Sequence, residues 1–238
     1  MPSDHILFFE EYIMKKNEKT TKLCGGIPIP NNITELVFII DKSGSMSGLE
    51  SDTVGGFNSM IEQQKKLDGE VLVSTVLFNH RSDVVHDRVS IENIEPMSRD
   101  EYCVCGSTAL LDALGEAIRH ISNIHKYARR EDVPEKTIFL ITTDGMENSS
   151  RKYSSDKVKR MIKEKEELGW EFIFVAANID AVETAGAIGI RPERAASYCH
   201  DSEGTGMLYR AMGSAVTSYR KGRRVDDEWS KELKKTKG

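Results

Sequence analysis

The sequence predicts an α/β protein with an open, mostly parallel sheet of six strands, helices on both faces and one antiparallel edge strand. Two observations predict this fold class. Short segments rich in β-branched and aromatic residues alternate with stretches whose apolar residues recur every three or four positions, as in amphipathic helices. Several strand segments are near-continuous apolar runs, which is typical of strands buried on both faces of a parallel sheet. Strands and helices that alternate in this way are joined by right-handed crossovers.

The strand segments differ in one informative respect. The predicted strands are residues 35–41, 70–78, 83–89, 136–143, 171–178 and a short 195–199. The third segment alternates polar and apolar residues, and the loop that separates it from the second is short enough for a hairpin. This pattern predicts an edge strand that pairs antiparallel with its predecessor.

The predicted helices lie between these strands. Their apolar stripes include Val54, Phe57 and Ile61, then Leu110, Leu114 and Ile118, then Val158 and Ile162, and finally Leu208, Met212 and Val216. Ser154 and Asp180 are residue types that cap helix N-termini and stand directly before two of these stretches. The last helix is expected over residues 204–221.

Length and composition limit the classes of function. A chain of 238 residues is long enough for one sizeable core, so one domain is expected. Its formal net charge of -5 argues against nucleic acid or an anionic membrane surface as a partner. No apolar run approaches the roughly 18 residues of a membrane span. The first residues lack the basic start and cleavage site of a secretory signal, so we expect a cytoplasmic protein.

The two ends of the chain fall outside the alternating pattern. We expect an N-terminal extension over residues 1–32, one domain over 33–222 and a charged C-terminal tail over 223–238. Within the tail, an apolar face could be formed by Val225, Trp229 and Leu233. A charged terminal segment is more often solvated than docked.

The four cysteines do not form a recognisable framework. Cys24, Cys103, Cys105 and Cys199 are scattered and contain no C-x-x-C pair, so idle thiols are expected in a reducing compartment. A zinc site made from these cysteines with His200 is disfavoured, because structural zinc sites usually show two well-spaced pairs of ligands.

Oxygen-bearing side chains follow two of the buried strands. Asp41, Ser43 and Ser45 are alternate residues of DKSGSM, directly after the first strand, and Asp144 follows the fourth strand. Thr108 lies in the segment GSTAL before a predicted helix. Because ligands bind at the carboxyl ends of the strands in open α/β sheets, these residues converge if the first and fourth strands are neighbours.

Two carboxylates and three hydroxyls are hard oxygen donors, which favour Mg²⁺ or Mn²⁺ over zinc or copper. With two anionic side chains, a divalent cation gives a nearly neutral site that can accept a carboxylate from outside. Lys42 lies between two of the candidate ligands, and the alternation of side chains at a strand end predicts that it points away from the site.

The combination resembles the metal-ion-dependent adhesion site (MIDAS) of the von Willebrand factor type A family, in an intracellular form of bacterial type. The resemblance implies a Rossmann-like fold over residues 35–222 and one bound divalent cation. It implies that Ser43, Ser45 and Thr108 ligate the metal through their hydroxyls, while Asp41 and Asp144 act largely through bridging water. It further implies a non-catalytic adaptor whose partner protein supplies a Glu or Asp carboxylate, in assemblies that include ATPases or stress-response proteins.

Other functions remain as alternatives. The same acidic crevice could serve a metal-dependent phosphohydrolase, because aspartyl-phosphate enzymes also place an aspartate after the first strand of an α/β fold. A third interpretation is a domain that keeps the fold but has lost metal binding. The sequence argues against nucleotide binding through a P-loop, since no G-x-x-x-x-G-K-[ST] occurs, and against a serine hydrolase, since GSMSG has Met46 at its centre.

Overall fold

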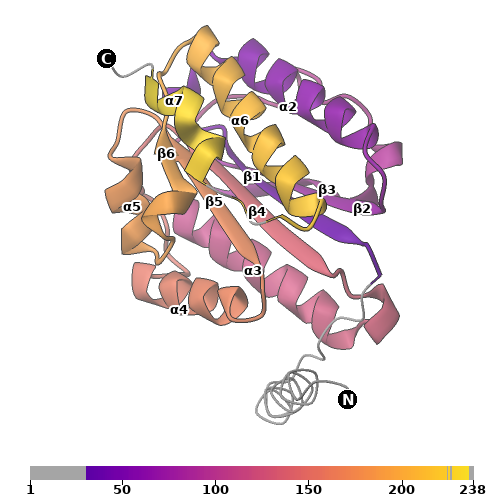
Figure 1. Cartoon of the computed structure of the whole chain (residues 1–238). Coiled ribbons are helices and arrows are strands. Elements are labelled where there is room, and N and C mark those ends of the chain that lie inside the picture. The colour runs from indigo at the N-terminus through magenta and orange to yellow at the C-terminus, as the bar shows by residue number, and fades with distance from the viewer. Residues whose placement is uncertain (1–30, 224, 226, 236–238) are drawn as a thin grey trace, which may run out of the picture.

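The six strands form one sheet in the order β3-β2-β1-β4-β5-β6 (Figure 1). The computed structural model describes residues 31–223, 225 and 227–235. The strands are β1 (Thr34–Asp41), β2 (Val71–Phe78), β3 (Ser82–Ser90), β4 (Lys136–Thr143), β5 (Glu171–Ala176) and β6 (Ala195–Ser197). All neighbours pair parallel except β2 and β3, which form an antiparallel hairpin at the edge. The predicted fold class is confirmed.

The order of the strands reverses at β1, which lies between β2 and β4. In the register of the sheet, Asp41 at the end of β1 pairs with Phe78 of β2, and Ile40 pairs with Thr142 of β4. The chain therefore passes from β1 to β2 on one side, and after the β2–β3 hairpin it returns to place β4 on the other side of β1. A crevice opens at the carboxyl ends of β1 and β4 in such an arrangement.

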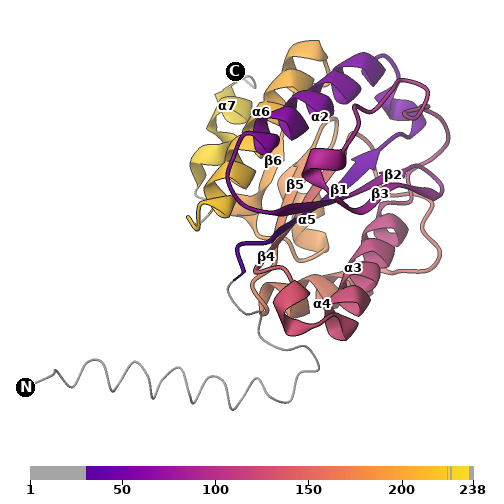
Figure 2. The same cartoon turned by 90° about the vertical axis from the view of Figure 1, so that its right-hand side faces the viewer.

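Helices cover both faces of the sheet (Figures 1 and 2). On one face lie α2 (Glu50–Lys65), α6 (Ser202–Arg220) and α7 (Lys231–Lys235), and on the other lie α3 (Leu110–Tyr127), α4 (Ser155–Glu166) and α5 (Ala181–Ala187). Alternate residues of β1 serve the two cores: Phe38 belongs to the first and Ile39 to the second, and both are fully buried. This accounts for the near-continuous apolar pattern of the central strands.

The helix starts follow from local capping. Ser154 accepts a hydrogen bond from the backbone N–H of Lys157, and Asp180 caps α5, as expected. Helix α6 begins at Ser202 and not at Gly204, because the side chain of Asp201 accepts the N–H of Gly204 and so acts as the N-cap.

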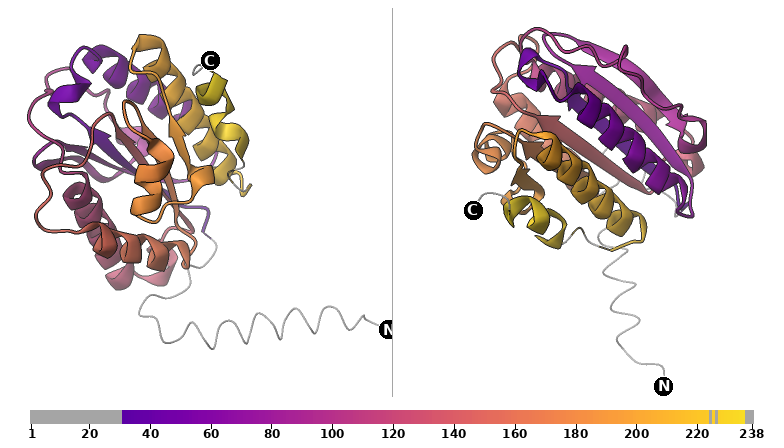
Figure 3. Two further views of the ribbon diagram at one scale, coloured as in Figure 1. Left: turned by 90° about the vertical axis from the view of Figure 1, so that its left-hand side faces the viewer. Right: turned by 90° about the horizontal axis from the view of Figure 1, so that it is seen from above.

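The described part of the C-terminal segment packs onto the domain (Figure 3). Val225, Trp229 and Leu233 are buried in the core that includes α6, and the indole N–H of Trp229 donates to the carbonyl of Glu193 at 3.0 Å. The apolar face expected from the sequence therefore packs against the domain. Residues 1–30, which hold Cys24 and most of the expected extension, lie outside the described residues, and the three-part division of the chain stays a prediction.

A buried carboxylate lies near the start of β1, at the opposite end of the strand from Asp41. The side chain of Glu35 is fully buried and pairs with Arg88 of β3 at 2.7 Å and with His125 of α3 at 2.5 Å. Paired charges of this kind satisfy a carboxylate that would be costly to bury alone. Among the described residues, no helix is both long and apolar enough to cross a membrane.

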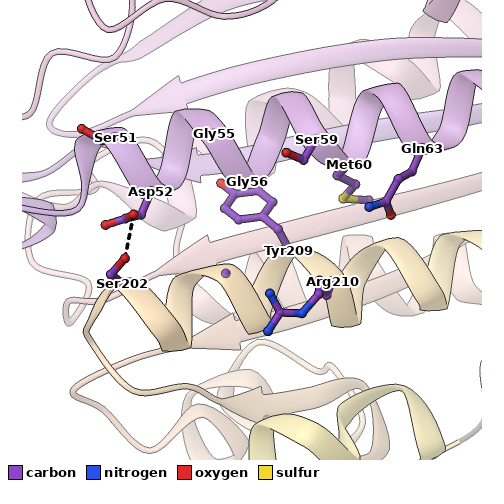
Figure 4. Close-up of a pocket in the computed structure, with 11 residues that line it drawn as sticks. Ser51, Asp52, Gly55, Gly56, Ser59, Met60, Gln63, Ser202, Tyr209 and Arg210 are labelled. Atoms are coloured by element: carbon purple, nitrogen blue, oxygen red, sulfur yellow. Dashed lines mark hydrogen bonds between the residues drawn. The ribbon is translucent and has the colours of Figure 1, made fainter.

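Helices α2 and α6 approach each other closely at a glycine (Figure 4). A hollow of about 410 Å³ runs between them, and at its head Ser202 donates to Asp52 at 2.8 Å. A Cβ atom added at Gly56 would lie 2.3 Å from Cδ2 of the buried Tyr209 ring, whereas one added at Gly55 would meet nothing within 4 Å. The hollow contains none of the candidate metal ligands, so we assign it to helix packing.

This pair of glycines gives a matched test of the packing. Gly56→Ala should lower the free energy of unfolding by about 1–3 kcal/mol, because the buried ring must move to admit a methyl group. Gly55→Ala should raise it by about 0.5–1 kcal/mol, since alanine favours the helix and nothing obstructs it. Urea unfolding of both variants measures the two effects, and equal changes of the same sign would contradict the packing described for α2 and α6.

Candidate metal centre

The ends of β1 and β4 bring two carboxylates to the same crevice. Asp41 is the last residue of β1, and Asp144 directly follows β4. Their exposed fractions are 0% and 1%. The expected convergence of these residues is therefore present, because β1 and β4 are hydrogen-bonded neighbours.

Three groups hold Asp41 in place. Its Oδ1 accepts the backbone N–H of Ser43 at 2.7 Å, and its Oδ2 accepts the hydroxyl of Thr143 at 2.6 Å. The hydroxyl of the buried Tyr102 donates to the backbone carbonyl of Asp41. The carboxylate is thus fixed by the loop that follows β1 and by the neighbouring strand β4, and the backbone of Asp41 is held by the loop before α3.

The hydroxyls of the DKSGSM loop face the second carboxylate. The Oγ of Ser45 donates to Oδ1 of Asp144 at 2.5 Å and lies 3.0 Å from the Oγ of Ser43. A Cβ atom added at Gly145 would lie 3.1 Å from the Oγ of Ser45 and 3.2 Å from the Oγ1 of Thr108. The hydroxyls from two different loops therefore approach one point beside Gly145, and all five predicted residues are brought together.

Backbone hydrogen bonds fasten the Thr108 loop to its neighbours. The N–H of Gly44 donates to the carbonyl of Gly106 at 2.9 Å, which joins this loop to DKSGSM. On the other side, the N–H of Thr108 donates to Oδ1 of Asn148 at 3.0 Å, and its carbonyl accepts the N–H groups of Asn148 and Ser149. Gly106 has φ of 78°, a conformation that glycine adopts without strain.

Burial dominates the electrostatics of the two carboxylates. Removal from water raises the pKa of Asp41 above its ordinary value of 3.8, and hydrogen bonds from Thr143 and Ser43 oppose this shift. Burial also raises the pKa of Asp144, opposed by the hydrogen bond from Ser45 and by the nearby His200. Each charge is therefore disfavoured in the metal-free protein, and a cation would favour both.

One oxygen of Asp144 has no hydrogen-bond partner. Its Oδ2 is buried, and the Nε2 of His200 lies 3.4 Å away. Buried polar atoms without a partner are rare, and an ion is one of the groups that satisfies them. No three Cys, His, Asp or Glu side chains cluster as metal ligands in the described residues, so a cation in this crevice would need the hydroxyls as well. Hard oxygen donors of this kind fit Mg²⁺ or Mn²⁺.

Lys42 points away from the centre, as predicted. Its ammonium group forms a 2.6 Å ion pair with Asp83 on the edge strand β3. This contact lowers the pKa of Asp83. The cation between the candidate ligands therefore does not compete with a metal.

Two acidic side chains near the crevice serve the loops. Glu147 accepts the backbone N–H of Leu111 in the first turn of α3 and those of Ser149 and Ser150. Asp112 accepts three consecutive backbone N–H groups, from residues 151–153. Both brace the segment that joins β4 to α4.

The arrangement does not resemble an activated serine nucleophile. The Oγ of Ser45 donates to a carboxylate, whereas His200 contacts the other oxygen of that carboxylate. A serine hydrolase needs the histidine as general base next to the serine hydroxyl. The geometry suits the binding of an ion better than acyl transfer.

Comparison with known proteins identifies the fold. No family model and no curated protein matches the chain. Solved structures do match: a von Willebrand factor type A protein from Catenulispora acidiphila has a TM-score of 0.50 at 16% identity, over 76% of this chain and 42% of that chain. The protein has a von Willebrand factor A-like fold.

Two further structures support this assignment. The manganese-loaded TRAP protein of Plasmodium vivax matches with a TM-score of 0.52 at 15% identity, over 76% of this chain and 73% of that chain. Proximal thread matrix protein 1 from the mussel byssus, with a zinc-occupied MIDAS motif, matches with a TM-score of 0.52 at 14% identity, over 81% and 46%. The chain thus spans less than half the length of the byssus and Catenulispora proteins. Identities this low establish the fold alone.

Removal of one carboxylate should stabilise the metal-free von Willebrand factor A-like domain. Asp144→Asn keeps an acceptor for Ser45 but deletes a buried charge, so in EDTA at pH 7 its free energy of unfolding should exceed that of the wild type. The folded-state pKa of Asp144 is raised, so the folded protein binds this proton more readily than the unfolded chain. The free energy of unfolding of the wild type should therefore rise as the pH falls toward 3.8. The difference in free energy of unfolding between Asp144→Asn and the wild type should become smaller over the same range.

Urea unfolding in EDTA at pH 7 and pH 5 measures this effect. Asp100→Asn, which removes a charge from an exposed position, is the matched control and should change stability little. A variant of Asp144 that is less stable than the wild type at pH 7 without metal would contradict the electrostatic account.

Proposed function

We propose that the protein is a divalent-cation-dependent module that binds an acidic side chain of a partner protein. The observation that carries the proposal is the convergence of two buried carboxylates and three hydroxyls from separate loops on one crevice, where Oδ2 of Asp144 has no hydrogen-bond partner. Such a set is poorly satisfied by the protein alone and is completed by a cation.

The residues divide into two roles in this proposal. Ser43, Ser45 and Thr108 would hold the cation through hydroxyl lone pairs, and Ser45 already directs its proton to a carboxylate. Asp41 and Asp144 would supply negative charge, largely through bridging water. Two carboxylates balance a divalent cation, so the site keeps the capacity to attract one more carboxylate from outside.

The proposal also specifies the kind of ion and the kind of partner that bind. Mg²⁺ or Mn²⁺ is favoured by the hard oxygen donors. The TRAP structure is manganese-loaded and the byssus protein has a zinc-occupied MIDAS motif, which supports a divalent cation at the corresponding place here. We propose Glu or Asp of a protein as the ligand and a non-enzymatic adaptor in the cytoplasm, in an assembly with ATPases or stress-response proteins. A negative net charge gives no support for nucleic acid or an anionic membrane.

Calorimetric titration tests this function directly. Mg²⁺ or Mn²⁺ should bind the wild type at a single site with a Kd near 1 mM, about −4 kcal/mol, and should not bind Ser43→Ala/Ser45→Ala. A glycine-rich peptide with one aspartate should then shift amide resonances of the crevice in the presence of Mg²⁺, and EDTA should abolish the shift.

The control variant removes two hydroxyls elsewhere. Ser47→Ala/Ser59→Ala, at exposed positions, should bind the ion and the peptide like the wild type. Equal heats for the wild type and Ser43→Ala/Ser45→Ala at millimolar protein would contradict the metal site. Peptide shifts that persist in EDTA would contradict the role of the metal in binding.

A further inference from the structure

A second hollow adjoins the metal centre. Its volume is about 490 Å³, and it lies between the β2–β3 hairpin, the start of α3 and the segment before α4. The residues that matter for its chemistry are Arg81, Ser107, Asp112, Glu116, Arg151 and Lys152. None of them has a role in the metal centre proposed above.

The hollow and the metal centre share a wall. Ser107 lines the hollow and directly precedes Thr108, whose hydroxyl faces the metal centre. Ser149, also in the wall, donates its hydroxyl to Ser107 at 2.5 Å and its backbone N–H to the carbonyl of Thr108 at 3.1 Å. The hollow is therefore within reach of a ligand held at the metal centre, because the Cα atoms of consecutive residues are only about 3.8 Å apart.

The acidic groups of the hollow are already satisfied. Asp112 accepts the backbone N–H groups of Arg151, Lys152 and Tyr153 at 2.8–2.9 Å. Glu116 pairs with the ammonium group of Lys152 at 2.5 Å. Both carboxylates keep their negative charge, but their hydrogen bonds go to these backbone groups and to Lys152.

The lining of the hollow carries one excess positive charge, because Arg81, Arg151 and Lys152 stand against Asp112 and Glu116. Arg81 is 70% exposed and reaches Asp83 only at 3.8 Å, and Asp83 is held at 2.6 Å by Lys42. The side chain of Arg151 is exposed, and within the described residues it makes no ion pair. In a protein with a net charge of -5, these cations beside the crevice form a local positive patch. Guanidinium groups match carboxylates geometrically and can bind them through two hydrogen bonds.

We propose that this hollow is an anion subsite that binds a second acidic side chain of the partner. The inference rests on the proposed function, since the first acidic side chain would be the one at the metal centre. In an extended peptide, alternate side chains point to the same face. The preferred ligand is therefore a protein segment with two acidic residues separated by one residue, in which the second contacts Arg81 and Arg151.

Two synthetic peptides test the subsite in the full-length protein. Acetyl-Gly-Asp-Gly-Glu-Gly-amide and the same peptide with Gln in place of Glu are titrated in saturating Mg²⁺, with amide shifts as the readout. The Glu peptide should bind the wild type roughly threefold to tenfold more tightly, as expected for two partly exposed charge pairs. Arg81→Gln/Arg151→Gln should remove this preference and leave the affinity for the Gln peptide unchanged.

The matched control is Arg119→Gln/Arg160→Gln, which deletes two exposed arginines of α3 and α4 outside the hollow and should preserve the preference. Equal affinity of the wild type for both peptides would overturn the subsite and leave the proposed function intact. A preference that survives Arg81→Gln/Arg151→Gln would overturn its assignment to this hollow. If neither peptide binds the wild type in Mg²⁺, the proposed function and the subsite are both wrong.

Discussion

The burial of two carboxylates in one crevice is the constraint on which the site depends. Asp41 and Asp144 are held at the ends of adjacent central strands with almost no exposure to water. Burying each charge has an electrostatic cost that hydrogen bonds offset only in part. One oxygen of Asp144 accepts no hydrogen bond at all. A cation would remove this cost, so the same feature that weakens the metal-free protein would favour the binding of a metal in the proposed function.

The loops around the crevice are hydrogen-bonded to one another. The N–H of Cys105 donates to the carbonyl of Lys42, the N–H of Gly44 to that of Gly106, and the N–H of Ala109 to that of Asn79. Glu147 and Asn148 connect the segment after β4 to the same group of loops. The hydroxyls that would hold the cation are therefore pre-positioned, which limits the ordering that binding requires.

The sequence was sufficient to predict the strands because their apolar runs are long and regular. All six predicted strands agree with the structure within two residues at either end. The largest differences are at the ends of the last two, where 171–178 stops at Ala176 and 195–199 stops at Ser197; just beyond β5, Asn178 has φ of 56°. The convergence of Asp41, Ser43, Ser45 and Asp144 was predictable for a related reason, since the ends of the neighbouring parallel strands β1 and β4 meet at one edge. Thr108 lies in the loop before α3, and its role as a ligand follows only from the resemblance to the metal-ion-dependent adhesion site.

The supporting contacts could not be predicted in the same way. Tyr102 reaches the carbonyl of Asp41 from a loop without periodic structure, and Thr143 looks in the sequence like any β-branched residue of a buried strand. Glu35 is similar: its partners Arg88 and His125 lie 53 and 90 residues away. Such contacts depend on tertiary positions that one sequence does not specify.

The proposed function requires that a divalent cation binds between these loops. Substoichiometric Mn²⁺ added to ¹⁵N-labelled protein tests it most directly, because the paramagnetic ion broadens the amide resonances closest to it. We expect the resonances of Ser43, Ser45 and Gly145 to disappear first, while those near Glu35, at the opposite end of β1, persist. Excess Mg²⁺ should restore the spectrum. Broadening centred on other acidic surfaces, or spread evenly over the protein, would contradict this requirement.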